Sequence, residues 1–227
     1  MTSVPIGAAP VTDAHDPHAT STGLDNKKIA IWAFIGSECM LFASLISTYL
    51  IYKGRSKVGP FPHEVWTDPM TGQQMKAILN IPVTSASTFV LLMSSLAMVL
   101  ALAAVQHKNV PKRTTGERIL GSSQLWLMMT ALLGITFLGF QAYEFTSFVH
   151  EGLTLRTNLF GSSFFTLTGF HGAHVTAGVI WLLTLFAIDR KRGLGPRDEV
   201  NVDIAALYWH FVDVVWIAIF TLVYLIQ

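Results

Sequence analysis

The stretch TGFHGAHVTAGVIW, residues Thr168–Trp181, decides how this sequence folds. It lies within an apolar run over about 159–188, which is longer than the roughly 20 residues that a helix needs to cross a bilayer. Yet the run carries two histidines, His171 and His174, three positions apart. Ionisable residues are costly in a membrane helix and usually mark a function or a buried contact. The stretch therefore predicts a membrane helix with a polar face turned toward other helices.

The rest of the sequence repeats this pattern. The chain of 227 residues is 52% hydrophobic and 13% charged, about half the roughly 25% charge of soluble domains. We therefore expect an all-α, polytopic membrane protein with five transmembrane helices in a bundle. Their approximate bounds are 29–52, 79–105, 120–148, 159–188 and 204–226. The net charge of +1 gives no indication of a nucleic-acid partner.

The first 26 residues differ from the rest. Residues 1–26 are rich in Pro, Ser, Thr and Ala, which predicts a disordered polar tail before a transmembrane domain at 27–227. No basic segment precedes a hydrophobic one there, so the tail does not read as a signal peptide. Its His15 and His18 are too sparse for a dedicated metal site.

Lysine and arginine predict the orientation. Ten of the fifteen precede the first span or lie in the second and fourth loops, and five lie in the first and third loops. Because cytoplasmic loops carry the excess of positive charge, we expect the N-terminus in the cytoplasm.

Seven polar residues stand out inside the predicted spans: Glu38, Gln141, Glu144, His171, His174, His210 and Asp213. Glu38 shares a helix face with Phe42 and Tyr49, and lies roughly 14 Å from the cytoplasmic end at 1.5 Å per residue. At that depth we expect a carboxyl group to be protonated or firmly hydrogen-bonded, because burial disfavours its charged form.

The fourth span has two distinct faces. His171, His174 and Gly178 share one face, whereas Thr168, Gly172 and Thr176 form a small-residue series on another. Small residues let a neighbouring helix approach closely. We therefore expect this helix to pack on two sides, one close and one polar.

The third and fifth spans carry pairs at the same three-residue spacing. His210 and Asp213 share a face, so the two side chains could pair and lower the cost of burial. Gln141 and Glu144 share a face of the third span, where Glu144 near the outer end meets either water or a partner on another helix. The residues alone leave three interpretations open: a metal or haem site, a proton path, and a structural hydrogen-bonded seam.

Four motifs, in order on four spans, resemble one known family. TGFHGAHVTAGVIW and YWHFVDVVWIAIFTLVYL resemble the last two membrane helices of subunit III of haem-copper terminal oxidases. GSECMLF resembles the Ser-Glu motif of that family, and GFQAYEF resembles its third matching helix. The resemblance covers about residues 27–227 and fits the five-helix form, which lacks the first two spans of the seven-helix form.

The resemblance implies an accessory subunit without a catalytic residue, metal or haem of its own. It would contact subunit I, which holds the haem and copper, together with subunit II and membrane lipids. It would support proton uptake and protect the enzyme during turnover. Glu38 would be a buried acid facing a phospholipid cleft. His171, His174, His210 and Asp213 would form an interhelical polar seam, with Gln141 and Glu144 in the third-helix motif.

The resemblance also favours a bacterial inner (plasma) membrane protein of the aerobic respiratory chain. The motifs GFQAYEF and YWHFVDVVW favour the cytochrome c oxidase branch. A quinol oxidase subunit or a relative associated with nitric oxide reductase is the alternative. A stand-alone haem or transport protein is a further one, although no internal repeat or helix broken at the midplane supports transport.

Overall fold

Polar residues at both ends of each apolar run set where the helices begin and end. The computed structural model describes residues 25–56, 59, 64–67, 72, 74–75, 79–107, 116, 119, 121–195 and 198–226. Five helices in this part are long and apolar enough to cross a membrane. They are α1 (Asn26–Tyr52), α2 (Ile81–Gln106), α4 (Ser123–His150), α5 (Leu159–Arg192), and α6 (Glu199–Ile219) with the π-helix η2 (Phe220–Leu225). The predicted all-α membrane fold is confirmed, and the tail with His15 and His18 lies outside the described residues.

Four helices begin at a polar residue whose side chain accepts a hydrogen bond from a backbone N–H of the first turn. The four are Asp25, Asn80, Ser122 and Asn158. Such caps satisfy N–H groups that have no partner inside the helix. One feature was not expected from the sequence: the loop between α1 and α2 contains two antiparallel strands of two residues each, β1 (Trp66–Thr67) and β2 (Gln74–Met75).

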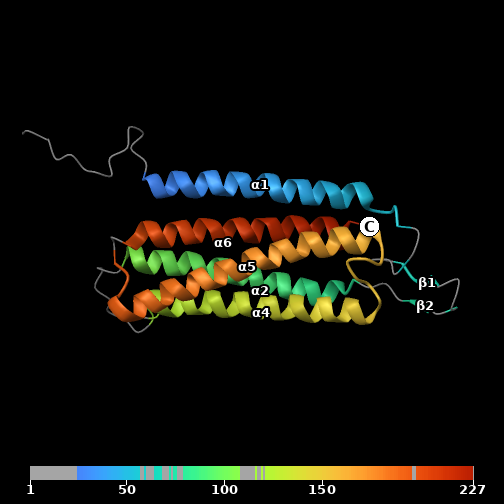
Figure 1. Cartoon of the computed structure of the whole chain (residues 1–227). Coiled ribbons are helices and arrows are strands. Elements are labelled where there is room, and N and C mark those ends of the chain that lie inside the picture. The colour runs from blue at the N-terminus through green and yellow to red at the C-terminus, as the bar shows by residue number, and fades with distance from the viewer. Residues whose placement is uncertain are drawn as a thin grey trace, which may run out of the picture.

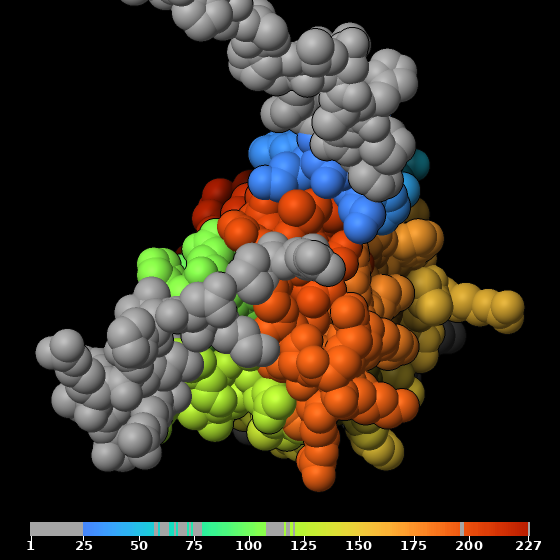
Figure 2. All heavy atoms as spheres, turned by 90° about the vertical axis from the view of Figure 1, so that its left-hand side faces the viewer, coloured from blue at the N-terminus to red at the C-terminus, as the bar shows by residue number. Residues whose placement is uncertain are grey.

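Helix α6 begins at Glu199, five residues before the predicted start of the last span. Its polar first turn is held by neighbours: Gln106 donates to Glu199 (2.9 Å), and Lys28 forms an ion pair with Asp203 (2.7 Å). Figure 2 shows the beginnings of α1 and α6 side by side at this end of the bundle. Apolarity alone could not predict this turn, because its residues are polar and bound by other helices.

Successive helices run in opposite directions, and α6 lies at the centre (Figure 1). Half of the most apolar window of the last span is buried inside the chain, against 17% for α1, which packs at the edge on α5 and α6. Without a hydrophobic difference between lipid and protein, membrane helices associate through close packing and hydrogen bonds.

Trp209 of α6 supplies both kinds of contact. Its indole N–H donates to Ser94 Oγ of α2 (3.0 Å). Its ring lies against two glycines: a Cβ added at Gly134 of α4 would come 2.7 Å from the ring, and one at Gly178 of α5 would come 2.8 Å from it. One buried side chain thus contacts three other helices.

We therefore expect Gly178→Ala to lower the free energy of unfolding of the detergent-solubilised protein by about 1–3 kcal/mol, because overpacking must displace the Trp209 ring. The melting temperature should fall with it. Gly169→Ala is the matched control on the same helix, since its Cβ would meet nothing within 4 Å. That control should be neutral or stabilising, because Ala is a better helix former than Gly. Equal melting temperatures for the two variants would contradict the close contact.

Candidate functional site

Glu38 and His174 connect α1 to α5 inside the predicted membrane region. His174 Nε2 lies 3.0 Å from Glu38 Oε2, and both side chains are 16% exposed. His174 Nδ1 lies 2.8 Å from the carbonyl oxygen of Phe170. Because a carbonyl only accepts hydrogen bonds, Nδ1 must carry a hydrogen.

This geometry limits the protonation of the pair. Nε2 of His174 either donates a second hydrogen to a Glu38 carboxylate or accepts one from the Glu38 carboxylic acid. In both forms a hydrogen bond joins the two side chains, and such a bond offsets much of the cost of burying their polar groups.

His171 lies in different surroundings from His174, although their spacing in the sequence puts both on one face of the helix. Its side chain is fully buried, stacks on Trp216 of α6 (ring centroids 4.9 Å apart) and meets the edge of Phe137 of α4 (5.9 Å). Neither ring nitrogen has a hydrogen-bond partner among the described residues. The two histidines thus separate, with His174 at the rim beside α1 and His171 in an aromatic core. Phe42 of α1 contacts both rings.

On α6, the hydrogen bond of His210 runs to another helix. His210 Nδ1 lies 2.7 Å from Ser95 Oγ of α2. Asp213 is 3% exposed, and neither of its oxygens has a hydrogen bond of good geometry to a described residue, although Ser95 lies beside it. The described contacts therefore link His210 to Ser95 rather than to Asp213, its possible partner by sequence spacing.

Gln141 and Glu144 of α4 each contact a neighbouring helix. Gln141 Nε2 donates to the carbonyl oxygen of Thr168 on α5 (2.7 Å), and a Cβ at Gly172 would come 2.9 Å from Gln141 Oε1. The close approach expected on the small face of α5 therefore occurs at Gly172.

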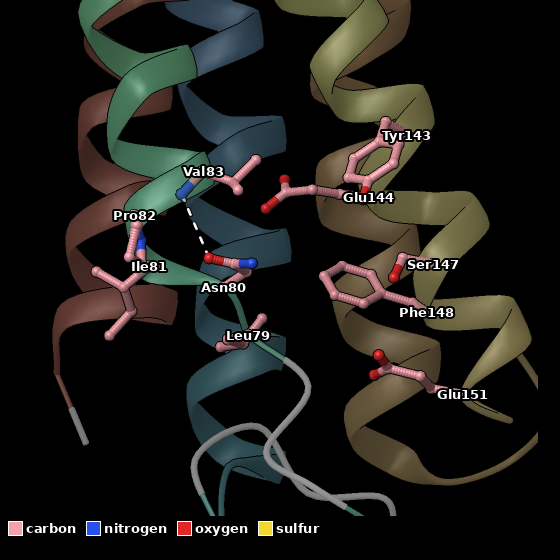
Figure 3. Close-up of a pocket in the computed structure, with 10 residues that line it drawn as sticks. All are labelled: Leu79, Asn80, Ile81, Pro82, Val83, Tyr143, Glu144, Ser147, Phe148 and Glu151. Atoms are coloured by element: carbon pink, nitrogen blue, oxygen red, sulfur yellow. Dashed lines mark hydrogen bonds between the residues drawn. The ribbon is translucent and has the colours of Figure 1, made fainter.

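Glu144 is 5% exposed, and its carboxyl group is bound from two sides. It accepts a hydrogen bond from Thr84 Oγ1 of α2 and a longer one from the Tyr224 hydroxyl of η2 (3.5 Å). The sequence left open whether Glu144 meets water or a partner on another helix. The structure shows partners on α2 and η2. Figure 3 shows that the carboxyl group also points across a cavity between α2 and α4.

Sequence reasoning missed two buried acids: Asp198, just before α6, and the more deeply buried Asp189. Asp189 is 2% exposed, and it accepts hydrogen bonds from Ser123 of α4 (2.5 Å) and from the backbone N–H of Leu194 (2.7 Å). Its position in the last turn of α5 was the available signal, because the helix dipole disfavours a carboxylate there unless donors compensate.

Among the described residues, no group of three or more His, Cys, Asp or Glu side chains could hold a metal ion. The polar residues instead meet other helices in separate contacts: Glu38 with His174, His210 with Ser95, Gln141 with Thr168 and Glu144 with Thr84. In this arrangement the polar groups link neighbouring helices at several depths.

Comparison with known proteins identifies the family of this chain. Residues 11–227 match the family model described as "Cytochrome c oxidase subunit III". The chain is 41% identical to cytochrome c oxidase subunit 3 of Bacillus sp. (strain PS3), over 93% of this chain and 91% of the relative. Two proteins of Bacillus subtilis (strain 168) are also similar. Its cytochrome c oxidase subunit 3 is 40% identical (88% and 86% covered), and its quinol oxidase subunit 3 is 36% identical (87% and 85% covered).

The matched region contains all five membrane helices and every polar contact described above. The expected resemblance is thereby confirmed, and with it the assignment to an oxidoreductase complex in a membrane. The chain belongs to the cytochrome c oxidase subunit III family of haem-copper oxidases.

Proposed function

We propose that the chain is a non-catalytic subunit of a proton-pumping cytochrome c oxidase. It would contact subunits I and II, stabilise subunit I and support its proton uptake, in a bacterial plasma membrane. The observation that carries the choice of electron donor is similarity: the cytochrome c oxidase subunits of Bacillus are 41% and 40% identical to the chain, and the quinol oxidase subunit of Bacillus subtilis is 36% identical.

The supporting role fits the contacts inside the chain. Polar contacts join α1, α2, α4, α5 and α6 to one another pair by pair. In this proposal the haems and copper belong to partner subunits, and Glu38 lies beside a phospholipid at the rim between α1 and α5.

A complex purified through a tag on this chain should oxidise reduced cytochrome c and contain haem bands, whereas the chain purified alone should show no Soret band. Removal of the chain should shorten the turnover lifetime while the haem spectrum of the remaining complex stays unchanged. Preferred oxidation of a quinol would favour the alternative branch. A Soret band in the isolated chain that His210→Ala abolishes would overturn the accessory role.

The pair of Glu38 and His174 gives a second test. Glu38→Gln should assemble nearly as wild type, because the amide can still hydrogen-bond His174 Nε2. Glu38→Lys should assemble poorly, because a cation at the centre of a membrane helix costs roughly 2.5–3.5 kcal/mol. The measurement is the amount of chain that co-purifies with subunit I. Equal losses in both variants would show that the carboxyl group itself is required.

The orientation proposed from the positive charges has its own test. Replacing the exposed Cys39 with Ala gives a background free of cysteine. On that background, Arg156→Cys should react with a membrane-impermeant maleimide added to intact cells, since the α4–α5 loop is predicted to face outward. Arg190→Cys should react only after the membrane is opened. The reverse pattern would invert the proposed topology.

A further inference from the structure

Helix α6 is buried on every side but one. From Val202 to Ile219, the residues that are not buried are Asp203, Leu207, His210, Val214, Ile217 and Ala218. Four of these form what we call the open stripe, at steps of three, four and three positions: Leu207, His210, Val214 and Ile217. Steps of three and four keep side chains on one helix face, and this is the spacing at which one helix packs along another.

The open stripe lies between α1 and α2. His210 contacts Ser95 of α2 (Nδ1 to Oγ, 2.7 Å), while the next residue, Phe211, meets Phe42 of α1 (ring centroids 6.2 Å apart). Figure 1 shows that α6 separates these two helices. The stripe is therefore the side of the central helix that neither α1 nor α2 covers.

Apolar side chains of two helices form this side of the bundle. Val214 and Ile217 of the open stripe are exposed. Leu92 and Val99 of α2 are exposed as well, and they lie three positions before Ser95 and four after it. Because residues three and four apart are neighbours on a helix surface, both flank the contact of Ser95 with α6. The face is thus apolar and extends over α6 and α2.

His210 is the polar member of the open stripe, and only one of its ring nitrogens is bound. Nδ1 is hydrogen-bonded to Ser95, whereas Nε2 has no hydrogen-bond partner within the described part of the chain. His210 lies eleven positions after the first residue of α6, or roughly 16 Å along the helix, which is near the middle of a hydrocarbon layer about 30 Å thick. Acyl chains offer no hydrogen-bond partner at this depth, and polar side chains of membrane helices generally meet other helices.

We propose that a transmembrane helix of another subunit of the oxidase complex packs along the open stripe and forms a hydrogen bond with His210 Nε2. A helix fits both features of the face, because its apolar side chains pack along Val214 and Ile217 while one polar side chain meets His210. The hydroxyl group of a serine or threonine, or the amide of an asparagine or glutamine, suits Nε2 in either tautomer, since each group donates and accepts. This contact rests on the proposed function, in which the chain is one subunit of an oxidase, and names the face that meets a partner.

Photo-cross-linking in the purified oxidase complex tests the face. Benzoylphenylalanine is incorporated in place of Val214 or, as the matched control, in place of Ile180 of α5, and these residues are 63% and 61% exposed. Their depths are similar, because Val214 lies fifteen positions after the first residue of α6 and Ile180 lies twelve before the last residue of α5. Illumination should join the chain to another subunit from position 214 and not from position 180. Equal cross-linking from both positions, or from position 180 alone, would contradict the choice of face.

Two substitutions test the hydrogen bond. His210→Asn places an amide near the position of Nδ1, so it can still bind Ser95 but does not reach the partner, whereas His210→Gln extends to the position of Nε2. As the detergent concentration is raised, the fraction of the complex that retains the chain should be about threefold lower for His210→Asn than for wild type. His210→Gln should restore most of that retention, which a role inside the bundle alone would not predict. Equal retention of His210→Asn and wild type would overturn the hydrogen bond to a partner.

Other occupants of the open stripe give different cross-linked products. A lipid adduct alone at position 214 would show that acyl chains cover the stripe, and a cross-linked pair of this chain would place a second copy there. Either product would overturn the proposal. An oxidase complex whose other subunits do not cross-link from position 214 contradicts this face only, whereas the absence of any oxidase partner contradicts the proposed function as well.

Discussion

The insertion of Trp209 between two glycines is the contact on which the bundle depends. The indole ring lies against Gly134 and Gly178, and its N–H is bound by Ser94, so one side chain of α6 contacts α4, α5 and α2. Seven residues later, on the same face, Trp216 donates to Thr88 of α2 (2.9 Å). Because packing and hydrogen bonds replace the hydrophobic effect in lipid, these two rings determine the axial position of α6 against α2.

Once α6 is placed, the faces of α5 follow. Gly178 faces Trp209 and His171 stacks on Trp216, which leaves His174 at the rim where α1 packs. Few residues of α1 are buried, so two polar contacts help to fix its position: Glu38 with His174 of α5, and Lys28 with Asp203 of α6. Two histidines three positions apart thus serve different contacts, because one faces the aromatic core and the other a carboxyl group.

Apolar runs were sufficient to predict the five helices, and helical periodicity placed Glu38 on the same face as the buried residues Phe42 and Tyr49. The hydrogen-bond partners could not be predicted. Thr84 and Ser95 are ordinary residues of an apolar helix, and only the antiparallel packing of α2 with α4 and α6 brings them to Glu144 and His210. Spacing along one helix shows which residues share a face, and the partner on the next helix depends on tertiary packing.

The three acids inside the predicted spans differ in what surrounds them, and this difference bears on their roles. Glu38 lies within hydrogen-bond distance of His174 on α5 (3.0 Å). Asp213 is enclosed near Ser95, out of reach of lipid. Glu144 alone combines hydroxyl donors on one side with a cavity that continues into an apolar groove. Glu144 therefore links α4 to α2 and η2, while its carboxyl group also borders a surface cavity.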